Sequence, residues 1–397
     1  MKRLVAIIAV VLLVAIAAMA ADDARFWWRW FQRVPAMVGL AGPEGANAVP
    51  DLQATIAGGD ARPIPACRNN TPALAEAARE AQAWLAARKT EAFLVWHDGC
   101  LITEHYASGD AATLRPAGAM AKSLMALATG VAIRQGAIPG LDARVARQLP
   151  EWRNDRRAAI RYRDMLTMHA GLQWYRQQAS PFSDFQRIII GSDYASRAVA
   201  LRSAAEPGRF YDYSAWTYDL LGIALARGGG APYEDLVSRW LSRPLGLSDM
   251  TIYVDRPGGT VHGNCCLHSR ADDWIRLGAL VVNEARQPRL LADGFVAEMG
   301  RPGADQPNYG LGAWLGTPYT PRREIASRRN PYPTPVKSVI AQSEPFLADD
   351  VMVFEGVGQT KTWIVPSRAL VIVRFGKAPK DWDDAVVPNL LLGALAP

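Results

Sequence analysis

The sequence predicts a mixed α/β (α+β) fold, in which an antiparallel sheet flanked by helices carries an inserted helical lobe. Strand-like segments, rich in β-branched and aromatic residues, lie near both ends of the domain, at 91–106 and 351–375. The middle of the chain, to about residue 256, is mainly helical in pattern. Half of the 397 residues are hydrophobic, as in an ordinary globular protein, and the length allows a large core. Strands from both ends can share a sheet if the middle folds as a separate lobe, and a cleft between the lobes is the expected ligand site.

The first 21 residues have the pattern of an export segment. Two basic residues precede an apolar run from Leu4 to Ala18, and the small-x-small tripeptide at 18–20 offers a cleavage site. The same run is also long enough for a membrane anchor, and the aromatic and arginine-rich stretch Arg25–Phe31 suits a membrane interface. Residues 1–21 are therefore either a signal peptide or an anchor. Both predict an exported protein, periplasmic or held at the inner membrane facing the periplasm.

The N-terminal extension, residues 22–75, is rich in Ala, Gly and Pro and weakly periodic up to about residue 70, as is typical of a linker. A helix is expected from about Thr71, its N-cap, to Arg88. Two strands, Glu91–Trp96 and Leu101–Tyr106, then flank Asp98-Gly99. An Asp-Gly pair between two β-rich runs predicts a hairpin.

The main domain, residues 76–397, is expected to divide into an α/β lobe (about 76–118 and 259–397) and a helical lobe (about 119–258). An apolar helix is predicted from about Ala119 to Gln135, where Gly136 stops it. The remaining expected elements are helices at Ile160–Met168 and Thr217–Arg227, strands near Tyr309–Leu315, Val351–Phe354, Thr362–Pro366 and Ala369–Phe375, and a closing helix at about Asp381–Leu395.

Charge and composition exclude several classes of function. The net charge is +6, but the sequence contains no cluster of Lys and Arg of the kind that binds a phosphate backbone. We therefore expect no nucleic-acid partner. The four cysteines fit no zinc pattern and the five histidines are scattered, so we expect neither a metal nor a cofactor. Export permits disulfides: Cys67 pairs with Cys100, or either pairs with one of the adjacent Cys265 and Cys266.

Five segments, taken in order along residues 80–397, resemble one family. They are the hairpin Glu91–Tyr106, the helix start Ala119-Met120-Ala121-Lys122-Ser123, the segment Leu166–Leu172, the stretch Pro207–Gly222 and the glycine-rich strand Gly356–Pro366. Together they resemble the class C β-lactamase and penicillin-binding-protein-like serine hydrolases, and their motifs look closest to the 6-aminohexanoate-dimer hydrolase branch. The resemblance implies a β-lactamase/transpeptidase-like fold acting on amides or esters.

The resemblance also implies an S-x-x-K site, in which a helix presents a serine nucleophile and a lysine base on one face. Ala119 occupies the position of the serine, and Lys122 matches the lysine. Tyr213 matches the tyrosine that relays the proton to the leaving group, and the amides of Ala119 and Val357 match the oxyanion hole. Further cleft residues are expected to be Trp174, Ser214, Trp216, Gly356, Gly358 and Gln359.

The chain departs from the family pattern most clearly at Ala119, because a methyl group cannot form an acyl intermediate. Three interpretations follow. The chain is a relative that lost acyl transfer and keeps its cleft for binding; or it is a copy of an active hydrolase with its serine changed to alanine; or another group attacks, such as Ser123, Ser214 or a water activated by Lys122. The expected ligand is a small amide, ester or peptide-like acyl compound, and a cleft that binds peptidoglycan would make the chain a cell-wall or partner-binding module.

Overall fold

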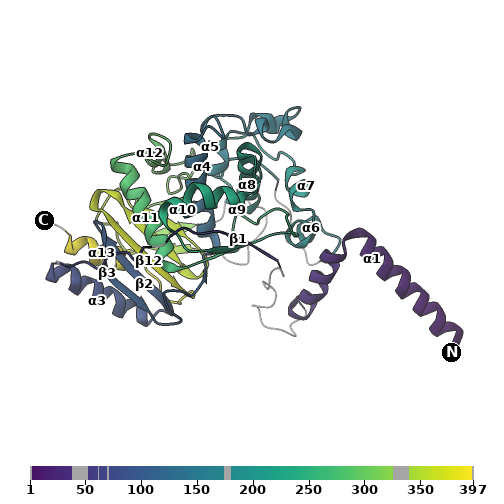
Figure 1. Cartoon of the computed structure of the whole chain (residues 1–397), viewed down its shortest axis with the longest axis horizontal. Helices are drawn as coiled ribbons and strands as arrows, with labels where there is room; N and C mark the ends of the chain where they lie inside the picture. The colour runs from purple at the N-terminus through teal and green to yellow at the C-terminus, as the bar shows by residue number, and fades with distance from the viewer. Residues whose placement is uncertain are drawn as a thin grey trace.

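The computed structural model describes residues 2–37, 52–60, 62–68, 71–173, 180–324 and 339–395. Its main sheet has six antiparallel strands in the order β3-β2-β12-β11-β10-β7 (Figure 1). Their bounds are β2 Thr90–His97, β3 Cys100–Tyr106, β7 Trp314–Leu315, β10 Met352–Glu355, β11 Lys361–Val365 and β12 Leu370–Gly376. Strands from both ends of the domain thus form one sheet, as predicted.

The hairpin of β2 and β3 follows from its turn residues. Asp98 and Gly99 both have positive φ, +40° and +100°, and His97 pairs with Cys100 across the turn. This is the geometry that favours an Asp-Gly pair, because glycine adopts positive φ without steric cost. The predicted hairpin is confirmed.

Helices cover the sheet. Helix α3 (Pro72–Ala86), capped by the Thr71 hydroxyl, packs with the last helix α13 (Val386–Ala394) and contacts β2 and β3. Helix α11 (Ala271–Arg286) lies on β2, β11 and β12. A Cβ on Gly278 would lie 2.5 Å from a methyl carbon of Val371, so the glycine allows α11 to approach β12 closely. The closing helix was predicted correctly but is shorter than expected.

The helical lobe is built around α4 (Ala121–Arg134), in which every residue from 121 to 132 is buried. A 3₁₀ turn, Gly118–Met120, precedes it, and Gly136 follows it with φ +71°. Helix α4 packs against α8 (Ala215–Gly229). The other helices are α5 (Tyr162–Leu166), α6 (Asp184–Ile190), α7 (Tyr194–Val199), α9 (Tyr233–Val237), α10 (Arg243–Leu245) and α12 (Phe295–Met299). The predicted strand at Tyr309–Leu315 is limited to β7, the two residues 314–315.

A second sheet differs from the sequence prediction. Its order is β1-β5-β6-β4, and its strands are β1 Gln53–Ile56, β4 Arg115–Pro116, β5 Met250–Tyr253 and β6 Leu267–Ser269. β1 comes from the extension that was expected to be a linker. β4 leads directly into the start of α4, and the Ala117 amide donates to the Leu267 carbonyl at 2.8 Å. The second sheet therefore fixes the position of residue 119. A short pair, β8 (Arg322–Glu324) with β9 (Val339–Ala341), forms a separate two-stranded sheet.

The N-terminal helix α1 (Lys2–Met37) also extends into the predicted linker. It bends at Asp23, whose φ and ψ of −158° and 90° are not helical. Its first half points away from the domain and its second half lies beside α6 (Figure 1). Within the described residues, Val5–Gln32 is long and apolar enough to cross a membrane, and its apolar window, of mean hydropathy 2.7, is entirely unburied.

Two disulfides resolve the cysteine alternatives: Cys67 pairs with Cys100, and Cys265 with Cys266. The first ties the segment before α3 to β3 across 33 residues. We predict that changing Cys67 and Cys100 to serine lowers the free energy of unfolding by about 3–4 kcal/mol, because the unfolded chain gains that loop entropy.

Urea unfolding of the double variant measures this loss. The matched control changes Cys265 and Cys266 to serine, since this pair of neighbours closes no loop. An equal loss in both double variants would contradict the loop-entropy explanation.

Candidate active site

The turn before α4 sets the position where the family carries its nucleophile. Gly118 has φ +55°, and Ala119 follows it, partly exposed, one residue before the buried Met120. Three residues after Ala119, on the same face of the helix start, comes Lys122. If the motif assignment holds, residue 119 offers a methyl group where the S-x-x-K arrangement needs a hydroxyl.

Lys122 is buried, and its amine has two neighbours. Nζ donates to the Asn264 carbonyl at 2.7 Å and lies 5.1 Å from the centre of the Tyr213 ring. Burial lowers the pKa of the Lys122 amine to about 8, although the nearby Asp219 carboxylate opposes the shift. A substantial fraction of the amine is therefore neutral near pH 8, as a proton acceptor has to be.

Asp219, on α8, organises the other side of this lysine. Its carboxylate accepts from the Asn264 amide at 2.9 Å, from the Asn264 side chain at 2.8 Å, and from the Tyr194 hydroxyl. Burial raises the pKa of Asp219 to about 6. Sequence reasoning missed this residue, although an aspartate inside the apolar stretch Trp216–Leu225 was a signal, because a buried carboxylate needs partners.

Tyr213 lies beside Lys122, as the motif predicts. Its ring stacks on Trp314 with 5.9 Å between centres and meets the edge of Tyr309 at 6.0 Å. Burial raises the pKa of Tyr213 well above its usual value, and the nearby Glu355 adds to the shift. The hydroxyl therefore stays protonated at neutral pH and can donate a hydrogen bond to a ligand.

The turn after β10, which begins at Gly356, contacts the turn that holds residue 119. A Cβ on Gly118 would lie 2.9 Å from the Val357 amide nitrogen, and one on Gly356 would lie 2.3 Å from the Ala117 carbonyl oxygen. Only glycines allow these two backbones to touch. The amide segments predicted to form an oxyanion hole, at Ala119 and Val357, thus belong to two turns in direct contact.

Arg374 holds the second turn in place. Its guanidinium, within β12, donates to the carbonyls of Gly358 and Gln359 at 2.9 and 2.8 Å. Gly358 has φ +80°, and a Cβ there would lie 2.4 Å from the Gly376 carbonyl oxygen. A side chain at position 358 would therefore collide with the backbone at Gly376. Sequence reasoning missed Arg374, since an arginine in a β-rich run also suits an exposed strand face.

Glu355, the last residue of β10, lies in a buried ion network. It accepts from Arg323 at 2.9 Å and from Lys361 at 3.3 Å, and both cations also pair with Asp384. The carboxylate is thus neutralised by partners within the fold.

The two serines considered as displaced nucleophiles are both buried. Ser123 donates its hydroxyl to the Gly312 carbonyl at 2.6 Å. Ser214, at the start of α8, has no hydrogen-bond partner for its hydroxyl among the residues that the structure describes. The ring of the adjacent Trp216 meets the edge of Phe185 at 6.3 Å. Trp174, also predicted to line the cleft, lies outside the described residues.

We predict that Ser123→Ala costs about 1 kcal/mol of stability, because the Gly312 carbonyl loses its buried donor, and that it leaves probe labelling and hydrolysis unchanged. Urea unfolding measures the change in stability. Intact mass after exposure to a fluorophosphonate probe measures the labelling. Ser214→Ala is the matched control, since it removes a buried hydroxyl without a bonded acceptor. The unaltered chain is expected to stay unlabelled; if it is labelled, loss of that label in either variant would identify a displaced nucleophile.

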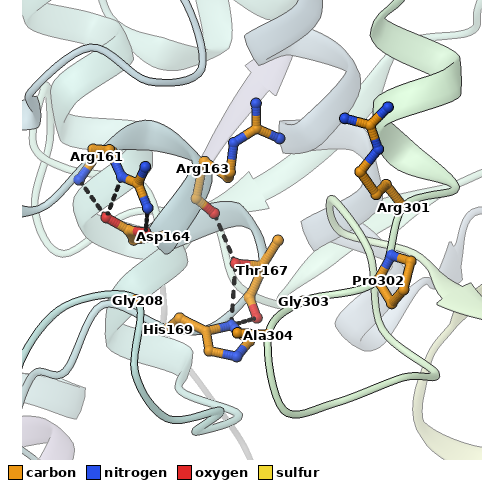
Figure 2. Close-up of a pocket in the computed structure, with 10 residues that line it drawn as sticks. All are labelled: Arg161, Arg163, Asp164, Thr167, His169, Gly208, Arg301, Pro302, Gly303 and Ala304. Carbon is orange, nitrogen blue, oxygen red and sulfur yellow. Dashed lines mark hydrogen bonds and ion pairs between the residues drawn. The ribbon is translucent and has the colours of Figure 1, made fainter.

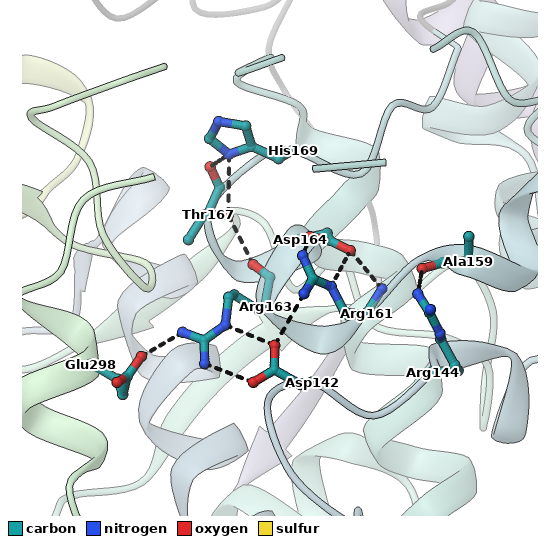
Figure 3. Close-up of polar contacts among 9 residues, drawn as sticks. All are labelled: Asp142, Arg144, Ala159, Arg161, Arg163, Asp164, Thr167, His169 and Glu298. Carbon is teal, nitrogen blue, oxygen red and sulfur yellow. Dashed lines mark hydrogen bonds and ion pairs between the residues drawn. The ribbon is translucent and has the colours of Figure 1, made fainter. Parts of the chain in front are cut away.

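A pocket of about 370 Å³ lies beside this region, and Figure 2 shows its lining. None of the predicted site residues lines it. Both ring nitrogens of His169 are engaged, with the Thr167 carbonyl at 2.6 Å and Asp305 at 2.8 Å. The three arginines that line the pocket all pair with carboxylates. Arg161 pairs with Asp142 and Asp164, and Arg163 pairs with Asp142 and Glu298 (Figure 3). Arg301 pairs with Glu298. The charged side chains that line this pocket are therefore already paired within the fold, and its arginines are neutralised.

The two-lobed α/β fold and a lysine-bearing helix start against a glycine turn define the scaffold of the serine β-lactamases and penicillin-binding proteins. The chain belongs to the beta-lactamase family, whose model matches residues 78–394. No curated protein matches the chain at a significant level.

Solved structures share this fold at low identity. A protein from Bacillus anthracis assigned as a 6-aminohexanoate-dimer hydrolase is 15% identical, with a TM-score of 0.64, and the match covers 93% of this chain and 94% of that one. A penicillin-binding-protein homologue from Caulobacter crescentus is 16% identical, with a TM-score of 0.60, covering 83% and 99%. A family VIII carboxylesterase is 14% identical, with a TM-score of 0.60, covering 82% and 97%. At this identity the three show a common fold.

Proposed function

We propose that this chain binds a small amide, ester or peptide-like acyl compound at the junction of its two lobes, and that acyl transfer is impaired because residue 119 is alanine. One observation carries the proposal: the buried Lys122 amine, held by Asn264 beside Tyr213, follows a methyl group by one helical turn. The base, the tyrosine and the two contacting turns are kept while the attacking atom is missing. An arrangement of this kind still orients an acyl group.

The N-terminal apolar helix belongs to the same proposal. We propose that it exports the domain and remains as its anchor, so that the site lies in the periplasm on a domain held at the inner membrane. Its apolar stretch is unburied, so the folded domain does not use it as core. An acyl compound of the cell envelope would then reach the site without entering the cytoplasm.

The binding half of the proposal is tested on the chain as it stands. Calorimetric titration with benzylpenicillin, a p-nitrophenyl acyl ester and a 6-aminohexanoate dimer is expected to give heat with at least one of them. Chromatography of the mixture should then return that compound intact. If all three give no heat, the proposed ligand class is wrong. If a bound compound is hydrolysed as fast as by the Ala119→Ser variant, the assignment of residue 119 is wrong.

A pH profile tests the role of Lys122 as the base. In an Ala119→Ser variant, kcat/KM is expected to rise with pH and to level off above about 8, since burial lowers the pKa of this amine to about 8 and only its neutral form accepts the serine proton. The measurement is ester hydrolysis between pH 6 and about 9.5, corrected for the uncatalysed rate. A rate that falls across this range would contradict a lysine base.

A further inference from the structure

The segment that follows the predicted cleavage site is folded onto the helical lobe. Phe26 and Trp30 are buried and form a small core of their own with Ile190, at the end of α6. Arg29 is also buried and donates to the Ile190 carbonyl at 3.0 Å. Residues that would begin a mature, cleaved chain are thus part of the packed structure.

Polar contacts fix the same segment at the bend of α1. The Asp23 carboxylate accepts from the Ser192 amide at 2.9 Å and from the Ser192 hydroxyl at 2.6 Å. It also accepts from the Phe26 amide at 2.9 Å, as an N-cap does. Asp22 pairs with Arg187 of α6 at 2.6 Å, and the Arg187 guanidinium lies 4.0 Å from the centre of the Phe26 ring. The bend is therefore specified by side chains on both partners.

Docking leaves a second, aromatic face of this segment uncovered. Trp28 is 60% exposed, Phe31 55% and Phe182, on the loop before α6, 78%. Trp27 links them, because its ring lies 6.3 Å from Phe31 and 5.8 Å from Phe182. We call Trp27, Trp28, Phe31 and Phe182 the aromatic collar. Large exposed aromatic side chains gathered in one place mark a surface that meets an apolar partner.

The first half of α1 indicates which partner this is. Its side chains from Val5 to Ile16 include nine large hydrophobic residues that are 50–65% exposed. An apolar helix of this kind is suited to the hydrocarbon core of a bilayer. The collar begins only a few residues after it, beyond the bend at Asp23. Trp rings and aromatic–arginine segments of this kind favour the headgroup region of a bilayer, where an amphipathic helix lies in the plane of the interface.

We propose that the aromatic collar lies in the headgroup region of the bilayer that the first half of α1 enters, so that the helical lobe is held against the membrane on its α6 side. The second half of α1 acts as an interfacial helix, with Phe26 and Trp30 toward the lobe and Trp28 and Phe31 toward lipid. Phe185 of α6 also contacts Trp216, a predicted cleft residue. Helix α6, on which the second half of α1 packs, therefore also contacts a residue that was predicted to line the cleft. This inference rests on the proposed anchoring by α1 and does not depend on the chemistry at residue 119.

Photocrosslinking tests the placement on the full chain in vesicles of phosphatidylethanolamine and phosphatidylglycerol. A benzophenone phenylalanine replaces Phe31 or Phe182 in the collar, or Tyr319 as the control, an exposed ring of the main domain. Lipid adducts at the two collar positions are expected to exceed those at Tyr319 by about tenfold, because only the collar reaches the headgroups. Intact mass is expected to show that residues 1–21 are retained.

Equal lipid labelling at Phe31, Phe182 and Tyr319 would overturn the proposal, and so would crosslinks from the collar to a second copy of the chain instead of lipid. Loss of residues 1–21 during export would overturn it too. Each variant is compared with the parent by near-ultraviolet circular dichroism, so an unfolded variant is recognised. A variant that fails this comparison is replaced by one with the label at Trp28. All readouts are independent of ligand binding and hydrolysis. Lipid labelling in a chain whose mass shows that residues 1–21 are retained tests the collar alone, so its failure is distinguishable from failure of the anchor and from failure of ligand binding.

Discussion

Ala119→Ser is expected to turn this chain into an acylating hydrolase, raising ester hydrolysis by roughly a thousandfold or more. The new hydroxyl stands one helical turn before the Lys122 amine, which takes its proton as the oxygen bonds to the acyl carbon. The two contacting turns at residues 119 and 357 supply amides for the developing oxyanion. The leaving alcohol or amine receives a proton by way of Tyr213, and water then releases the acyl group.

Initial rates on p-nitrophenyl esters, nitrocefin and short amide dimers measure this gain, with the chain as written run beside the variant. The matched control is Ala121→Ser, which adds the same hydroxyl to the same helix start but away from the lysine face. Comparable rates for the chain as written and for Ala119→Ser would show that residue 119 does not hold the attacking position. A gain in Ala121→Ser alone would show that the register of the helix is wrong.

Lys122→Met in the Ala119→Ser background is expected to remove the gain, lowering the rate by about 10²–10⁴-fold, because the serine then lacks its proton acceptor. Methionine fills a similar volume without charge, so the burial of this position is preserved. The rate is measured on the same esters at several pH values. Lys380→Met, which removes an exposed lysine, is the control and should leave the rate unchanged.

The same substitution has a second readout in stability. Burial lowers the folded-state pKa of Lys122 to about 8, whereas an unfolded lysine titrates near 10.4. The unfolded chain therefore binds more protons between these two values, and the parent gains stability as pH rises through that window. Lys122→Met is expected to be more stable than its parent below pH 8, with a difference that shrinks toward pH 10. A difference independent of pH would show that the amine is not buried as a titrating group.

The sequence predicted the parts of the fold that rest on local signals. Asp98-Gly99 marked the hairpin, Thr71 capped its helix, and the apolar run after residue 119 became α4. The order of strand-like segments also predicted a sheet made from both ends of the domain. These features depend on turn chemistry and on long periodic segments, which a single sequence reveals well.

The second sheet could not be predicted in the same way. Its strands are only two to four residues long, so a period of two has no room to show. One of them, Gln53–Ile56, lies in a stretch whose composition indicated a linker. Its pairing with Met250–Tyr253 joins segments almost 200 residues apart in the sequence. Only tertiary contacts determine such a strand.

Part of the candidate site was also beyond prediction from the sequence. Lys122 and Tyr213 were found because motifs name them, whereas Asp219 and Asn264 were not, because no motif does. Their role follows from burial: Asp219 needs donors inside the fold, and Asn264 supplies them while its own carbonyl holds the lysine. Arg374 was missed for a similar reason, since its carbonyl partners come together only in the folded chain.

Covalent labelling read by intact mass tests the placement of residue 119 most directly. After exposure to a fluorophosphonate or to benzylpenicillin, the chain as written is expected to keep its mass. The Ala119→Ser variant is expected to gain one adduct, mapped by peptide sequencing to residue 119. An adduct on the unaltered chain at Ser123 or Ser214, or an unlabelled Ala119→Ser variant that is folded, would contradict the account.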